Sequence, residues 1–150
     1  MTDRLRLIPR AALAALLALA FLLPGSPARA QKDTKAGKLT FEVYQDRAKE
    51  YRWHLKAANN KIVAASSDGY KNKADCKSAI ENIQANIGGK MKVEFFQDRA
   101  KEYRWRLKAP NGKIMATSGE GYKSKAGARD GFELLRDGAK SAAVMDKPAK

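Results

Sequence analysis

The chain has little of the residues that form disulfides, metal sites and histidine-based catalytic groups. Its 150 residues include one cysteine, Cys76, and one histidine, His54. A single cysteine cannot form an intramolecular disulfide. One cysteine and one histidine also cannot supply the four ligands of a structural zinc site. We therefore expect no disulfide within the chain, no metal and no cofactor.

Long hydrophobic runs are absent after residue 30. Before that point, three arginines within the first ten residues precede an apolar stretch at 11–23 and the small-residue motif Ala28-Arg29-Ala30. This is the pattern of a secretory signal with its cleavage site. The apolar stretch is shorter than the roughly 20 residues of a transmembrane helix. We expect an exported protein, periplasmic or secreted, that begins at Gln31 and has no transmembrane segment after cleavage; an uncleaved N-terminal anchor is the alternative.

Acidic residues are scarce relative to basic ones. The chain has 30 Lys and Arg against 16 Asp and Glu, a formal net charge of +14. The leader accounts for three of these charges, so residues 31–150 carry +11. Such a charge attracts anionic partners over long distances. Outside the cytoplasm these include anionic glycans, lipid headgroups, acidic proteins and extracellular nucleic acid.

The most prominent feature that is present is an internal repeat. Residues 41–86 recur from Val93 onward, and the nine residues QDRAKEYRW at 45–53 are identical at 97–105. A repeat at a fixed offset indicates one structural unit used twice. Each copy has only about 50 residues, which is marginal for an independent core, so we expect a shared one. The expected organisation is a signal peptide at 1–30, repeats at 38–89 and 90–146, and disordered tails at 31–37 and 147–150.

The hydrophobic pattern changes once within each copy. In the first copy, residues 38–44, 51–57 and 61–66 alternate as strands with one buried face. The sequence Asn59-Asn60, matched by Asn111-Gly112, predicts a tight hairpin turn in which both central residues have positive φ. A further short extended segment follows the helix of each copy, at 142–146 in the second and at 90–93 in the first, where it continues into the next strand.

A helical period follows the third strand of each copy. Asn72 and Ser124 are placed as N-caps, and Asp75 as a capping-box acid. The expected buried stripes are Cys76, Ile80, Ile83 and Ile87 in one helix and Ala128, Phe132 and Leu135 in the other. The expected fold class is α+β, with two tandem repeats forming one antiparallel sheet and the helices packed on one face.

These residues carry a resemblance to a known family. Phe41, Tyr44 and Asp46, the run at 51–57 and the pair Gly69-Tyr70, with their counterparts in the second copy, resemble the YegP-like family of small bacterial proteins, whose domain has no known function. The resemblance implies a β3-α-β repeat, two of which join in a single sheet and exchange their last strands. It implies no catalytic residues. The leader departs from the family, whose members are mostly cytoplasmic.

The main candidate site is a stripe of basic residues on the second strand of each copy. Alternation places each trio on the face opposite Tyr, Trp and Leu. Side by side in one sheet, the two stripes could bind an extended polyanion; the alternative is a solvated face whose cations pair with Glu42 and Glu94 across strands. The stripes consist of Arg52, His54 and Lys56 in the first copy and Arg104, Arg106 and Lys108 in the second.

Two further candidates have structural alternatives. Gly69-Tyr70 and Gly121-Tyr122 precede helix N-termini, where backbone N–H groups, together with Lys73 or Lys125, could hold a phosphate or carboxylate. The alternative is a glycine needed only for the turn. Trp53 and Trp105 could stack on bases or sugars, but they share a face with Leu55 and Leu107, which favours core packing.

The sequence argues against an enzyme. A catalytic triad would need His54, which lies in the basic stripe and is replaced by Arg106 in the other copy. The carboxylates of the 46–50 loop and its counterpart lie beside Arg and Lys, which favours ordinary ionised acids. We therefore expect a non-enzymatic module that binds an anionic envelope component. A structural, self-associating envelope protein is the first alternative, and a nucleic-acid-binding protein, which export disfavours, is the second.

Overall fold

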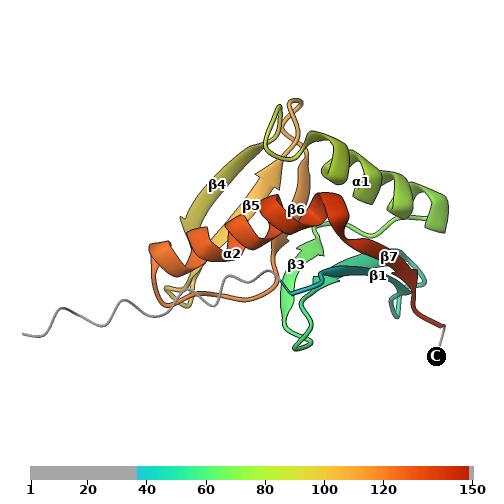
Figure 1. Cartoon of the computed structure of the whole chain (residues 1–150), viewed down its shortest axis with the longest axis horizontal. Helices are drawn as coiled ribbons and strands as arrows, with labels where there is room; N and C mark the ends of the chain where they lie inside the picture. Colours follow the sequence, from blue (N-terminus) through green and yellow to red (C-terminus); the bar gives the residue numbers. More distant parts are fainter. Residues whose placement is uncertain (1–36, 149–150) are drawn as a thin grey trace, which may run out of the picture. The chain divides into compact units, whose positions relative to one another are not determined.

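The computed structural model describes residues 37–148 (Figure 1). The predicted signal peptide and most of the two predicted tails lie outside these residues. Of the tails, Gly37, Lys147 and Pro148 are described, and the Lys147 backbone N–H donates to the Val43 carbonyl at 2.7 Å. No helix among residues 37–148 is long and apolar enough to cross a membrane.

The described residues form one seven-stranded sheet with two α-helices. The strands stand in the order β4-β5-β6-β3-β2-β1-β7, and all neighbours are antiparallel except β1 and β7, which are parallel. The α+β prediction is confirmed, with this one parallel pair as an exception to the expected antiparallel sheet. The strands are β1 (Thr40–Gln45), β2 (Tyr51–Lys56), β3 (Ile62–Ser66), β4 (Lys92–Gln97), β5 (Tyr103–Lys108), β6 (Ile114–Ser118) and β7 (Ala143–Asp146).

The two repeats meet where β3 pairs with β6. Ala65 lies opposite Thr117, and these residues occupy the same position in their respective repeats. An approximate two-fold axis therefore passes through the sheet at this pair. It relates β1-β2-β3 to β4-β5-β6, so equivalent positions of the two repeats lie on opposite sides of this axis.

Both helices, α1 (Lys73–Asn86) and α2 (Lys125–Gly138), lie on the same side of the sheet (Figure 1). Asn72 and Ser124 accept hydrogen bonds from the N–H groups of Asp75 and Gly127, which confirms both predicted N-caps. The apolar stripes of the helices meet the inner face of the sheet, where Trp53 and Trp105 are fully buried. One core therefore spans both repeats, as their small size requires.

The expected exchange of last strands occurs at one end only. After α2, a 3-10 turn at Ala139–Ser141 leads into β7, which crosses to the other repeat and pairs with β1. The corresponding segment after α1 does not cross to the other repeat, because residues 87–91 lead directly into β4. One edge of the sheet is therefore β7, which lies next to β1 of the first repeat. The other edge is β4, the first strand of the second repeat.

The hairpin turns differ from the prediction. Only Asn60 (φ 64°) and Gly112 (φ 82°) have positive φ, whereas Asn59 and Asn111 do not. The Asn60 N–H donates to the Ala57 carbonyl at 2.9 Å, as in a turn followed by one left-handed residue and a bulge. The bulge appears as a register shift between Leu55 and Lys56. The loop has one residue more than the predicted two-residue turn, and therefore only its last residue needs the left-handed conformation.

Candidate functional site

Both basic stripes lie on the face of the sheet opposite the helices. Along β2, the half-buried Arg52, His54 and Lys56 alternate with fully buried Trp53 and Leu55. Strands β3 and β6 separate β2 from β5, so three strand spacings, roughly 14 Å, lie between the stripes. The stripes share a face but are not side by side as the sequence suggested.

In the second repeat, one carboxylate holds two stripe cations. The Arg106 guanidinium donates two hydrogen bonds to Glu94, at 2.8 and 3.0 Å, and Lys108 forms an ion pair with the same side chain. These contacts lower the pKa of Glu94 to about 2, chiefly through the hydrogen bonds from Arg106 and then from Lys108. The carboxylate is therefore ionised at any physiological pH and offsets much of the local positive charge.

In the first repeat, His54 replaces Arg106 and the pairing changes. Among residues 37–148, Glu42 now forms its ion pair with Lys56 alone, at 2.7 Å. The His54 ring packs against Tyr44, with centroids 4.4 Å apart. Burial, followed by the positive charge of Lys56, lowers the pKa of His54 below its ordinary value. The imidazole is therefore neutral at pH 7, and this stripe carries less charge than its counterpart.

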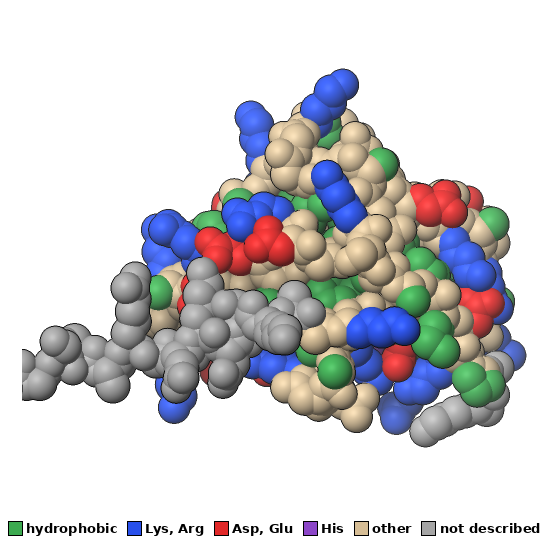
Figure 2. All heavy atoms as spheres, in the orientation of Figure 1, with side chains coloured by type: hydrophobic (Ala, Val, Ile, Leu, Met, Phe, Trp, Pro, Cys, Tyr) green, Lys and Arg blue, Asp and Glu red, His purple; other side chains and the backbone are tan. Residues whose placement is uncertain are grey.

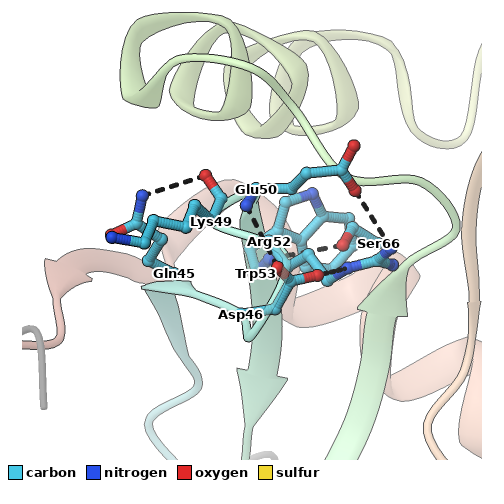
Figure 3. A network of polar contacts seen from close by, with 7 residues as sticks. All are labelled: Gln45, Asp46, Lys49, Glu50, Arg52, Trp53 and Ser66. Carbon is cyan, nitrogen blue, oxygen red and sulfur yellow. Dashed lines mark hydrogen bonds and ion pairs between the residues drawn. The ribbon is translucent and has the colours of Figure 1, made fainter.

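The first residue of each stripe belongs to a network of polar contacts at the end of the β-hairpin, which Figure 3 shows for Arg52 in the first repeat. Asp46 accepts hydrogen bonds from the Glu50 N–H at 3.0 Å and from Arg52 Nε at 2.7 Å, and Glu50 lies 3.5 Å from the same guanidinium. Arg52 lowers the pKa of Asp46 through its hydrogen bond. The second repeat reproduces these contacts with Asp98, Glu102 and Arg104.

The stripes are therefore close to electrically neutral. Their five Arg and Lys residues face six carboxylates within 4 Å, which agrees with the interpretation of a solvated face with cross-strand pairs. These carboxylates are Glu42, Asp46, Glu50, Glu94, Asp98 and Glu102. An incoming anion would have to displace them.

The helix N-termini are shaped first by packing. A Cβ at Gly69 would overlap the Glu50 side chain, and one at Gly121 would overlap Glu102. The glycines are thus required by the close approach of the neighbouring loop rather than by the turn conformation that the sequence suggested, because neither has a positive φ. Lys73 lies 3.5 Å from Asp146 and over the Tyr51 ring. Lys125 is exposed and has no ion pair within residues 37–148.

The structure points to basic residues that were not predicted as site residues. Arg47 and Lys49 are exposed in the β1–β2 loop, and in the described part of the chain their side chains have no acidic partner. Lys49 has a left-handed backbone (φ 60°), and its counterpart Lys101 does too (φ 61°). Glycine or asparagine adopts this conformation more easily. The identical repetition of QDRAKEYRW could have directed attention to these lysines.

More unpaired cations gather at the same two ends of the sheet. Lys71 follows β3, and Lys113, from the other repeat, lies over the Tyr70 ring at 6.0 Å. Lys123 and Lys61 are their counterparts at the other end, although Lys61 also pairs with Glu120 at 2.6 Å. In Figure 2, Lys and Arg side chains project around the rim of the visible face. We call these groups the strand-end loops: Arg47, Lys49 and Lys71 at one end, and Arg99, Lys101 and Lys123 at the other.

Other chemistries have little support in this geometry. Trp53 and Trp105 are fully buried, which confirms core packing and excludes them as stacking platforms. Cys76 is also fully buried, and burial raises the pKa of its thiol to about 11. Within residues 37–148, no cluster of three His, Cys, Asp or Glu side chains is arranged to hold a metal ion.

The repeated unit matches a described protein family. The model of a domain of unknown function, DUF1508, matches residues 46–93 and again 98–146. A UPF0339 protein from the ptx operon 5' region of Stutzerimonas stutzeri is 35% identical over 107 residues, which are 71% of this chain and 95% of that protein. A UPF0339 protein of Treponema denticola is 46% identical over 55 residues, 37% of this chain and 93% of its own. The chain belongs to the DUF1508 family, also described as UPF0339 and YegP-like.

Solved structures share the fold. The solution structure of yegP from E. coli, a protein of unknown function, aligns with a TM-score of 0.66 at 22% identity over 74% of this chain and 94% of that one. A UPF0339 protein from Shewanella oneidensis aligns with a TM-score of 0.62 at 24% identity, over 73% and 91% of the two chains. At these identities the likeness establishes the fold alone.

Proposed function

We propose that this protein is an exported, non-catalytic module that holds an anionic partner with its strand-end loops. The partner class is a glycan, a lipid headgroup or an acidic protein of the cell envelope. The observation that carries the proposal is the difference in ion pairing between the two groups of cations. The stripe cations are offset by carboxylates, whereas the cations of the strand-end loops have no acidic partner in the described chain.

The backbone of the loops supports this assignment. The Asp46 network and the Gln45 side chain, which donates to the Lys49 carbonyl at 2.9 Å, hold the loop in one conformation. A lysine in the left-handed region costs conformational energy that glycine would avoid. Both copies nevertheless have lysine there, and its side chain serves no described internal contact. A preorganised loop loses little entropy when a ligand binds.

The two-fold arrangement favours an extended or multivalent ligand. The strand-end loops lie at opposite ends of one rigid sheet, so one long polyanion or a multivalent surface can engage both. Linked contacts of this kind raise the apparent affinity well above that of either end alone. The open sheet face, with Arg52, His54, Lys56, Arg104, Arg106 and Lys108, lies between the ends and adds contacts where the ligand displaces the carboxylates.

The test is retention of residues 31–150 on arrays of anionic glycans, lipids and nucleic acids at low and moderate salt. We expect selective retention on one envelope class. The double variant Arg47→Glu, Lys49→Glu should lose it, while Lys90→Glu, Lys140→Glu, which changes the net charge equally at exposed sites outside the loops, should retain most of it. Equal loss in both variants would mean that only net charge matters, and preference for nucleic acid would favour the second alternative.

The alternative of self-association has an observation of its own. Among residues 37–148, strand β4 ends the sheet without a further strand on its outer side (Figure 1). Pairing between strand edges depends little on salt, whereas binding to a polyanion weakens steeply as salt rises. The salt dependence of each activity therefore distinguishes the two.

A further inference from the structure

The two edges of the sheet are not equivalent. At one edge, β7 covers β1 and is itself only four residues long, followed by Lys147 and Pro148. Short strands, lysine and proline are features that protect an edge from pairing with another chain. At the other edge, β4 has six residues, no proline and a regular register with β5. The β4 edge is therefore longer and has no proline, although Lys92 stands at its start and Glu94 near its middle.

The side chains of β4 also lack the cover that their counterparts have. Phe41 and Val43 of β1 are 0% and 1% exposed, whereas Val93 and Phe95 at the same positions of β4 are only half-buried. The difference follows from the one-sided strand exchange, because β7 adjoins β1 whereas no strand within residues 37–148 adjoins the outer side of β4. A six-residue edge with half-buried apolar side chains favours strand addition.

The direction of the backbone groups of β4 follows from the repeat. Lys147 donates to the Val43 carbonyl, so the peptide groups of Val43 point away from β2. Phe95 is the counterpart of Val43, and the pairing of β4 with β5 has the same register as that of β1 with β2. Because alternate residues of a strand point the same way, Val93, Phe95 and Gln97 direct their N–H and C=O groups outward.

We propose that β4 pairs antiparallel with β4 of a second copy, so that two sheets join across a two-fold axis. This surface adjoins the strand-end loop that contains Arg99 and Lys101 but does not use their side chains, and the inference does not depend on the proposed function. Only residues whose backbone N–H and C=O groups point outward can form hydrogen-bonded pairs between the two copies. The helices of both copies must also lie on the same side of the joined sheet. Three registers satisfy this, centred on Glu94, Phe95 or Phe96.

Charge selects one of the three registers. Centring on Glu94 places two copies of that carboxylate opposite each other, and centring on Phe96 places Glu94 opposite Asp98. Both arrangements bring like charges together, which destabilises cross-strand pairs. Centring on Phe95 places Lys92 opposite Asp98 and brings the two Phe95 rings together on the helix side. Phe95 already packs against Phe132, with centroids 6.2 Å apart, so the joined rings would extend the core across the axis.

The first test is the mass of residues 31–150, which contain every strand and both helices, by sedimentation over a wide range of concentrations. We expect a monomer–dimer equilibrium that changes little with salt. Phe95→Lys should raise the dissociation constant at least about tenfold by placing two charges at the axis. Val144→Lys, on the 40% exposed position of β7, is the matched control and should leave the dimer intact.

Cross-linking tests the register even if Phe95→Lys does not fold. In a Cys76→Ala background, Phe95→Cys should form a disulfide-linked dimer, because paired Cα atoms are about 5.5 Å apart. Glu94→Cys and Phe96→Cys should cross-link in a mixture of the two variants but not alone. A strict monomer, open polymers disrupted by Val144→Lys, or efficient cross-linking of Glu94→Cys with itself would each overturn the proposal.

Discussion

At the residue scale, Glu94 shows how the protein offsets its own charge. It lies between Arg106 and Lys108, and its pKa of about 2 is well below the usual 4.5. A carboxyl group with a lowered folded-state pKa stabilises the fold above its unfolded pKa. That stabilisation is lost as the pH falls through the folded-state pKa. The window of interest therefore extends from about pH 4.5 down to about pH 2.

Glu94→Gln should reduce the free energy of unfolding at pH 7, because the two cations lose their charged partner. At pH 2 the difference from the wild type should largely disappear, since the wild-type carboxyl is then protonated to a large extent. Urea unfolding at both pH values measures this. Glu81→Gln, at an exposed site of α1, is the control. A wild-type advantage over Glu94→Gln that was equal at both pH values would contradict the role given to the ion pairs.

Cys76 should be unreactive in the folded protein. Its side chain is fully buried between α1 and the sheet, and its thiol pKa of about 11 leaves little thiolate at pH 8. The thiolate is the species that reacts with disulfide reagents. A colorimetric thiol assay at pH 8 should show almost no reaction in native buffer and one equivalent in denaturant. Rapid native labelling would show that this part of α1 opens readily.

At the scale of the elements, the two helix starts are unequal. In α1, Asn72 and Asp75 form a reciprocal pair of hydrogen bonds, with Asn72 Nδ2 donating to the Asp75 carboxylate at 2.7 Å and the Asp75 N–H donating to Asn72 Oδ1 at 2.8 Å. In α2, the position of Asp75 is occupied by Gly127, which gives only its N–H to Ser124 at 3.0 Å. Glycine is also a poor helix former.

Gly127→Asp should therefore stabilise the protein by about 1 kcal/mol, from helix propensity and a first-turn acid. A Cβ at this site meets its nearest neighbour at 3.4 Å, which leaves room for the side chain. Thermal unfolding compared with the wild type measures the gain. Gly131→Ala is the opposing control, because its Cβ would overlap the Tyr122 hydroxyl and should destabilise the same helix. A loss of stability in Gly127→Asp would refute this view of the cap.

Most elements were predictable because their signals are local. Alternation along 51–57 and the stripe at Cys76, Ile80 and Ile83 depend on residues close in sequence, and the structure has the strand and the helix there. The parallel pairing of β7 with β1 is not local: it depends on a contact between residues about 100 positions apart. The prediction of a two-residue turn at Asn59-Asn60 was wrong because the same residue types suit both two-residue and bulged loops.

The candidate site was less predictable than the fold. The outward face of Arg52 and Lys56 followed from alternation, but their pairing with Asp46 and Glu42 depends on rotamers and register. The separation of the two stripes depends on the strand order, which alternation does not determine. Arg47 and Lys49 were missed because they read as ordinary loop charges until their acidic neighbours were assigned to other residues.

At the scale of the whole molecule, the two-fold symmetry of the repeats accounts for the paired basic loops, and the loss of that symmetry at one edge accounts for the open strand β4. Two-fold repetition places equivalent basic loops at both ends of a rigid sheet, which suits an extended anionic partner. The single covalent connection breaks the symmetry, because residues 87–91 join α1 directly to β4 and leave that edge open. Anion binding and edge pairing would therefore use different parts of the molecule, and a charge change in the loops should leave any dimer intact.

The most direct measurement is the salt dependence of affinity for the polyanion that the array identifies. For the wild type, the logarithm of the association constant should fall steeply and linearly with the logarithm of the salt concentration. Lys49→Gln combined with Lys101→Gln should lower the affinity and reduce the slope by about one for each lysine that no longer binds the polyanion. The charge-matched pair Lys90→Gln, Lys140→Gln should leave the slope unchanged. Identical slopes for all three proteins would contradict the assignment of the partner to the strand-end loops.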